Sequence, residues 1–182
     1  MVNTLWDNIF RRGERENDLV QVLSRNILFE SLSTRELVFL KDLVHVRSFH
    51  PGETIFRQGE IGIGMYILVS GNVDIFIEDL QQIEGEPTSV LVTSLGPGDF
   101  FGELSLVEDK GRRTATAIAR DQTKLVGFFK PDLIDISERN PSTGVHILMR
   151  LGEVLGRRLK ETSEKVTLLR REIKTLREQS EK

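Results

Sequence analysis

The hydrophobic positions along the chain change their period twice. Up to about residue 43 apolar residues recur at helical spacing, which predicts helices over residues 1–17, from Leu19, and after Ser33. Ser33 and Glu36 stand three positions apart ahead of the apolar run LVFL, the pattern of a capping box at a helix start. From Val44 onward the period shortens to that of strands, and after residue 141 helical spacing returns.

The middle of the chain reads as a series of short strands. The apolar segments MYILVSG, VDIFIED, SVLVTSL and TATAIARDQTKLVGFF are separated by turns such as Pro51-Gly52, Gln58-Gly59-Glu60 and Gly96-Pro97-Gly98. Many short strands with Gly and Pro turns indicate a β-sandwich or a jelly roll. Pro131 then begins a short helix that Asn140-Pro141 ends.

The C-terminal segment carries a heptad pattern. Its apolar or seam positions are spaced by four and three, at Leu155, Leu159, Thr162, Val166, Leu169, Ile173 and Leu176. β-branched residues at a and leucine at d favour a parallel two-stranded coiled coil, so we expect a homodimer. The alternative is a helix packed only on its own domain.

These patterns predict three regions. An amphipathic helix spans residues 1–17, with Leu5, Trp6, Ile9 and Phe10 on one face. It either packs on the domain or its dimer mate, or docks on a partner or a membrane surface. A mainly β body with flanking helices follows at 18–141, and the long C-terminal helix and coiled coil occupy 142–182.

Composition narrows the function classes. The chain has 182 residues, a formal net charge of −3 and no cysteine, so disulfides and thiolate catalysis are excluded. From Arg150 onward ten Lys and Arg face six Asp and Glu, which suits a charged coil, and direct DNA binding is not expected. No run approaches the roughly 18 apolar residues of a membrane span, and no secretory signal is present, so we expect a cytoplasmic protein.

The stretch from Gly98 to Ala119 carries residues that suit a cyclic phosphate ester. Glu103–Val107 reads as one helical turn, whose N–H groups at Leu104 and Ser105 are predicted to be free to face an anion. Gly102 would allow a ligand to approach the backbone, since it has no Cβ.

Two charged side chains in the same stretch complete this chemistry. Arg113 offers a planar fork for two phosphate oxygens, and Glu103 can accept a hydrogen bond from a ribose hydroxyl. Thr114 would face away from the Arg113 side in a strand, and it reaches a ligand only if the strand begins after it. The plainer alternative is an ordinary ion pair between Glu103 and Arg113 beside a turn at Gly102.

The segment FGELSLVEDKGRRTATA resembles the phosphate-binding cassette of cyclic nucleotide-binding domains, and the likeness extends over about residues 19–166. The resemblance implies a double-stranded β-helix (jelly roll) flanked by helices, with cAMP or cGMP as the ligand and no other cofactor. It implies that Glu103 binds the ribose 2′-hydroxyl, and that Arg113 and the Ser105 N–H bind the phosphate with Thr114 beside them. The purine side would be lined by Ile75, Val92 and Leu95.

Within this family the C-terminal helix is similar to that of the catabolite activator, or cAMP receptor, type. The similarity implies that Thr162 contacts adenine within its own subunit, that Ser163 does so across the dimer, and that Arg158 points towards the phosphate and Glu103. Three features depart from the family pattern. Arg112 replaces a common proline, Thr114 recurs in cGMP-responsive members, and the likeness ends near Val166 with no helix-turn-helix domain after it.

We therefore expect a homodimeric cyclic nucleotide sensor without catalytic activity, which signals through its C-terminal helix to an unidentified downstream protein. One alternative is a cAMP receptor-type transcriptional regulator, or a fragment of one, whose DNA-binding domain is missing. Another is a jelly-roll metalloenzyme of the cupin type. Such an enzyme needs clustered histidines, and His45, His50 and His146 have no second histidine at ligand spacing.

Overall fold

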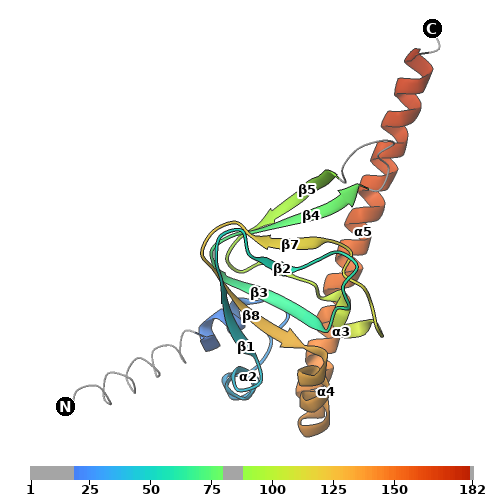
Figure 1. Ribbon diagram of the computed structural model, residues 1–182. Coiled ribbons are helices and arrows are strands. Elements are labelled where there is room, and N and C mark those ends of the chain that lie inside the picture. Colours follow the sequence, from blue (N-terminus) through green and yellow to red (C-terminus); the bar gives the residue numbers. More distant parts are fainter. Residues whose placement is uncertain (1–18, 80–87, 181–182) are drawn as a thin grey trace.

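The computed structural model describes residues 19–79 and 88–180. Within these residues a β-rich body is flanked by helices, and one long helix runs past the body to the C-terminal end (Figure 1). The helix predicted over residues 1–17 lies outside the described residues.

Two four-stranded sheets make up the body. The strands are β1 (His45–Phe49), β2 (Thr54–Phe56), β3 (Gly64–Ser70), β4 (Val73–Asp79), β5 (Thr88–Leu95), β6 (Phe100–Phe101), β7 (Thr116–Ala119) and β8 (Thr123–Phe129). Their order is β1-β8-β3-β6 in one sheet and β2-β7-β4-β5 in the other, with antiparallel pairing. The mainly β body with helices is thereby confirmed, whereas its closure as a jelly roll stays a prediction.

The helices begin and end where local sequence signals place them. Residues 19–25 are helical, followed by α2 (Thr34–Lys41), α3 (Leu104–Val107), α4 (Lys130–Arg139) and α5 (Pro141–Ser180). The capping box of α2 is confirmed, since the Ser33 N–H donates to Glu36 Oε2 at 2.8 Å and Ser33 Oγ accepts from the Glu36 N–H at 3.4 Å. The predicted stop before Pro141 is also confirmed, because α4 ends with Asn140 as its C-cap.

The apolar residues form two cores, one on each side of the first sheet. One core lies between the two sheets and includes Phe49, Leu68 and Leu125. The other lies between the first sheet and the helices and includes Met65 and Ile67. Strand β3 therefore contributes buried side chains to both cores, which explains why its sequence is a continuous apolar run rather than an alternating one.

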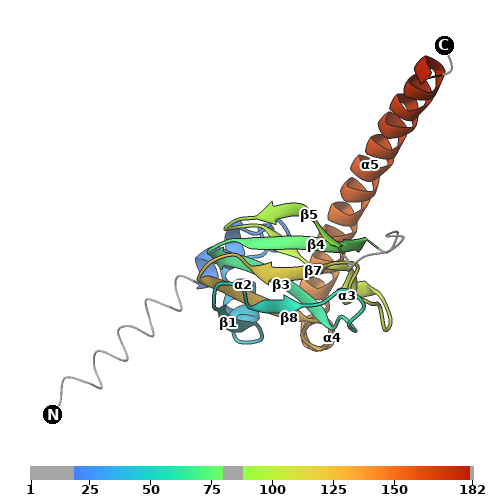
Figure 2. The ribbon, with the colours of Figure 1, turned by 45° about the horizontal axis from the view of Figure 1, so that its top comes forward.

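Helix α5 has a packed part and a projecting part (Figure 2). Ile147, Leu151 and Val154 are buried against the body. The seam residues beyond them are exposed, by 43–69%, at Leu159, Val166, Leu169, Ile173 and Leu176. The alternative of a helix packed only on its own domain is therefore wrong for this projecting part. No helix among the described residues is long and apolar enough to cross a membrane.

Candidate functional site

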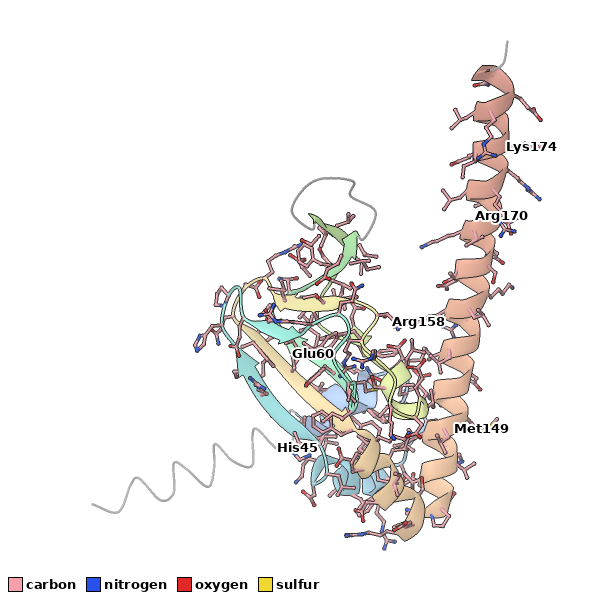
Figure 3. The ribbon with its side chains drawn as sticks, turned by 45° about the vertical axis from the view of Figure 1, so that its right-hand side comes forward. His45, Glu60, Met149, Arg158, Arg170 and Lys174 are labelled. Carbon is pink, nitrogen blue, oxygen red and sulfur yellow. The ribbon has the colours of Figure 1, made fainter. Side chains whose placement is uncertain are left out.

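A cavity of about 270 Å³ lies between the second sheet, α3 and α5. Figure 3 shows Arg158 projecting from α5 towards the β body at this level. Nine of the predicted site residues line the cavity: Ile75, Leu95, Gly102, Glu103, Leu104, Ser105, Arg113, Thr114 and Arg158. The fold thus brings together residues that are more than 80 positions apart in the sequence, from Ile75 to Arg158.

Arg113 is a buried cation at the inner end of this cavity, with a side chain that is only 7% exposed. Its Nη1 donates to the carbonyl oxygen of Gly102 at 3.1 Å and to Ser105 Oγ at 3.0 Å. The guanidinium carbon lies 4.0 Å from the ring centroid of Phe56, a cation–π contact. Burial lowers the pKa of the Arg113 guanidinium, and among the described residues no carboxylate forms an ion pair with it.

Phe56, the ring that contacts Arg113, packs against aromatic rings from two other strands. Phe56 of β2 stacks on Tyr66 of β3, with ring centroids 6.2 Å apart, and lies 5.7 Å from Phe101 of β6. Sequence reasoning did not identify this group, because the three rings are distant in the chain. Pairing of β3 with β6 joins Tyr66 to Phe101, and packing of the two sheets places Phe56, which contacts the guanidinium, against them.

Glu103 is paired with α5 rather than with Arg113. Its Oε1 lies 2.6 Å from Arg158 Nη1, and the Glu103 side chain is 8% exposed. Arg158 also stacks over Phe100, 4.7 Å from its ring centroid, and donates to the Phe100 carbonyl oxygen at 3.3 Å. The expected approach of Arg158 to Glu103 is present, and an ordinary Glu103–Arg113 ion pair is not.

Two glycines let the groups around Arg113 pack closely. Gly102 has φ +78°, and a Cβ there would collide with Arg113 Nη1. A Cβ on Gly62 would collide with Ser105 Oγ and lie 3.2 Å from Arg113 Nε. The role predicted for Gly102 was ligand approach, but its absent side chain makes room for Arg113. Gly62 was not predicted at all, since its neighbours are remote in sequence.

Helix α3 is the predicted single turn, but one of the two N–H groups that were expected to be free is engaged. The Ser105 N–H, expected to be free for an anion, donates to the carbonyl oxygen of Gly102 at 3.2 Å. The reason is local, because a tight turn at the start of α3 forms a bond between residues three apart. Ser105 therefore contributes to the site through its hydroxyl, which accepts from Arg113.

The apolar wall of the cavity differs from the prediction at one residue. Ile75 and Leu95 line it, but Val92 does not, and Val92 is 54% exposed. The cause is a β-bulge: Ile75 pairs with Thr93 and Phe76 with Leu91, so Val92 is left without a partner residue. Thr93 occupies the cavity wall instead.

The three hydroxyl residues predicted for the ligand lie in different places. Thr114 lines the cavity, and β7 begins after it at Thr116, which is the condition the sequence set. Thr162 and Ser163 are exposed on α5 and are not among the lining residues of a single chain. Thr162 Oγ1 donates to the Arg158 carbonyl oxygen at 2.8 Å, so its hydroxyl is held against its own helix.

Comparisons with known proteins identify the family of this chain. Residues 46–140 match the family model of the cyclic nucleotide-binding domain. The cyclic AMP receptor protein of Thermus thermophilus is 33% identical over 142 residues, which cover 78% of this chain and 61% of that protein. A cGMP-dependent protein kinase of Caenorhabditis briggsae is 35% identical over 107 residues, which cover 59% of this chain and 14% of the kinase.

A solved structure gives the same picture of the fold. The crystal structure of the Thermus thermophilus catabolite activator protein superposes with a TM-score of 0.69 at 32% identity, covering 79% of this chain and 63% of that one. The chain thus spans less than two thirds of the length of these bacterial relatives. On the match over residues 46–140, this chain belongs to the cyclic nucleotide-binding domain family.

Proposed function

We propose that this chain is a cyclic nucleotide sensor, a regulatory protein rather than an enzyme. The observation that carries the proposal is Arg113, a buried guanidinium with no carboxylate partner among the described residues. An unpaired buried charge is costly, and a phosphate anion in the adjoining cavity would compensate it. Glu103 would then accept from the ribose hydroxyl while Ile75 and Leu95 face the purine.

We take cAMP as the ligand and cGMP as the second candidate. A relative that is 33% identical and covers 78% of this chain is named a cyclic AMP receptor protein. Thr114 in the cavity lining, together with the likeness to a cGMP-dependent kinase, supports the second candidate. Calorimetric titration of the protein with each nucleotide distinguishes the two.

The same titration tests the site. Arg113→Ala should abolish measurable binding, because it removes the buried positive charge that the described residues place in the cavity lining. Arg139→Ala is the matched control: that arginine is 65% exposed on α4, where it pairs with Asp135 at 2.7 Å. Absence of binding of both nucleotides to the unmodified protein at millimolar ligand would refute the sensor proposal.

The projecting part of α5 supports a parallel homodimer as the signalling element. Seam residues such as Leu169 and Ile173 remain 56% and 50% exposed in the single chain, and a second copy would bury them. The ligand would bias the geometry of this coiled coil by binding one arrangement more tightly, with Thr162 and Ser163 completing the pocket. We further propose that a downstream protein binds the coiled coil and responds to this change in its geometry.

Two neighbouring leucines test the dimer. Leu169 lies on the predicted seam and Leu168 lies off it, yet each is 56% exposed. Leu169→Asp should convert the dimer to a monomer in sedimentation equilibrium, whereas Leu168→Asp should leave the mass unchanged. A monomeric unmodified protein, or equal effects of both changes, would refute the coiled-coil arrangement.

A second candidate function follows from the length of the relatives. Several are named cAMP-activated global transcriptional regulators, and the matched region covers 54% of one from Salmonella typhimurium. The chain would then be the ligand-binding piece of a DNA-binding regulator. This candidate predicts that the full product of the source gene retards DNA specifically at physiological salt and that this chain alone does not; no retardation by either would favour the stand-alone sensor.

A further inference from the structure

A second arginine stands at the phosphate end of the cavity. Arg112 precedes Arg113, lines the same cavity as Arg113 and Ser105, and has an exposed side chain. Its Nη1 donates to the carbonyl oxygen of Gly59 at 2.6 Å, which holds the guanidinium at the rim. The two successive arginines therefore line the cavity at different depths: Arg113 is buried, and Arg112 is exposed at the edge.

The backbone around Arg112 is clamped to the turn before β3. The Gly59 N–H donates to the Arg113 carbonyl at 2.8 Å, and the Arg113 N–H donates to the Glu60 carbonyl at 2.8 Å. Ile61 and Arg112 form an isolated antiparallel bridge, which lies between the Arg113–Glu60 bond and a bond from the Gly62 N–H to the Gly111 carbonyl at 2.9 Å. The turn at Gly59 and Glu60 thus fixes the backbone position of Arg112 and also supplies the carbonyl oxygen that accepts from its guanidinium.

The guanidinium of Arg112 keeps most of its donors for another group. A guanidinium has five N–H donors, and one points to Gly59. Arg112 forms no ion pair within residues 19–79 and 88–180. Glu60 is the carboxylate of the same turn, and its Oε2 accepts from the Arg57 N–H at 3.1 Å. A cyclic phosphate has two oxygens outside its ring that share one negative charge. Arg113 Nη1 already donates to the Gly102 carbonyl and to Ser105 Oγ, so Arg112 offers further donors for these oxygens.

We propose that Arg112 is a further ligand-binding residue, a rim cation that contacts the nucleotide phosphate together with Arg113. The inference rests on the proposed function of the cavity. Because the contact is with the phosphate, it strengthens binding of cAMP and cGMP equally and leaves the choice of purine unchanged. Because the side chain is exposed, its contribution falls as salt increases.

Calorimetric titration of the full chain with cAMP and with cGMP, at about 50 mM and about 300 mM salt, tests the proposal. At low salt Arg112→Gln should weaken both affinities by the same factor, about three- to tenfold for one exposed charge-assisted contact. The loss should shrink at high salt. Arg112→Lys should keep the salt dependence of the unmodified protein but bind less tightly than it, since lysine keeps the charge and loses the fork.

Arg47→Gln is the control, because Arg47 is 63% exposed and pairs with Glu53 at 3.3 Å, and it is not among the lining residues of the cavity. Equal affinity and equal salt dependence of Arg112→Gln and the unmodified protein would overturn the role of Arg112 while leaving the sensor intact. A change in the cAMP-to-cGMP ratio would also overturn it. Failure of the unmodified protein to bind either nucleotide would remove the proposed function and this inference together.

Discussion

Replacing Arg113 with methionine would separate what the guanidinium does for the fold from what it does for the ligand. Methionine has a similar length and can fill the space beside Phe56, where the guanidinium carbon now lies 4.0 Å from the ring centroid. It has no charge and no donor for Ser105 Oγ or the Gly102 carbonyl, which are the present acceptors of Nη1. The substitution therefore removes the cation and preserves most of the packing.

The substitution should change the free energy of unfolding of the ligand-free protein only slightly, because the cost of burying the charge and the gain from its contacts nearly cancel. Burying a charge costs several kcal/mol, whereas two hydrogen bonds from a charged donor return about 1.5–3 kcal/mol each and a desolvated cation–π contact about 2 kcal/mol. The Gly102 carbonyl keeps the Ser105 N–H as a donor after the change. We expect the free energy of unfolding to change by about 1 kcal/mol or less, equivalent to about 2–4 °C in Tm.

In the Arg113→Met variant, the stabilisation of the fold by bound nucleotide should be lost completely. Ligand at a hundred times its Kd stabilises a binding protein by about 2.7 kcal/mol, or about 5–11 °C for a chain of this size. Thermal unfolding followed by circular dichroism, at one protein concentration with and without cAMP, measures both quantities. A fall of more than about 3 kcal/mol in the ligand-free variant, typical of a broken buried ion pair, would mean that Arg113 is a structural residue.

Three further predictions concern neighbouring groups. Gly102→Ala should destabilise the fold by about 1–2 kcal/mol in urea denaturation and abolish nucleotide binding, because φ is +78° there and the new Cβ would displace Arg113; normal binding would contradict this. Arg158→Met should destabilise by about 1–2 kcal/mol, less than for a fully buried pair since Arg158 is 44% exposed, because Glu103 loses its cation; unchanged stability would argue against the pair. Hydrogen bonds from Ser33 and Thr143 lower the pKa of Glu36, so its carboxylate stabilises the fold above its unfolded pKa, and this contribution is lost as pH falls below about 5. Glu36→Gln should therefore make stability less dependent on acid pH, whereas an equally steep decline would contradict the assignment.

The features that could be predicted from sequence are those specified by neighbouring residues. The Ser33–Glu36 capping box, the single turn of α3 and the end of α4 before Pro141 each depend on a few adjacent side chains. The cassette residues Glu103 and Arg113 were found for the same reason, since their order within one loop identifies them. Repeated heptad spacing likewise predicted the length of α5.

The features that escaped prediction depend on contacts between distant segments of the chain. Whether Val92 or Thr93 faces the cavity is decided by a bulge against β4, and no residue of β5 alone signals that bulge. The requirement for glycine at position 62 comes from Ser105 and Arg113, more than 40 residues away. The approach of Arg158 to Glu103, by contrast, was expected, but only from the resemblance to the family, because the contact depends on how α5 packs against the body and no local pattern specifies it.

The continuity of α5 has a mechanical consequence. The helix runs without interruption from Pro141 to Ser180, so the segment beyond Arg158 behaves as a rigid arm whose near end is attached to the cavity (Figure 1). At 1.5 Å per residue this arm is about 33 Å long, and a tilt of about 5° at the Arg158–Glu103 contact would move its tip by about 3 Å. A small tilt at the pocket would thus move the C-terminal end of α5 by more than half the pitch of an α-helix, which is about 5.4 Å.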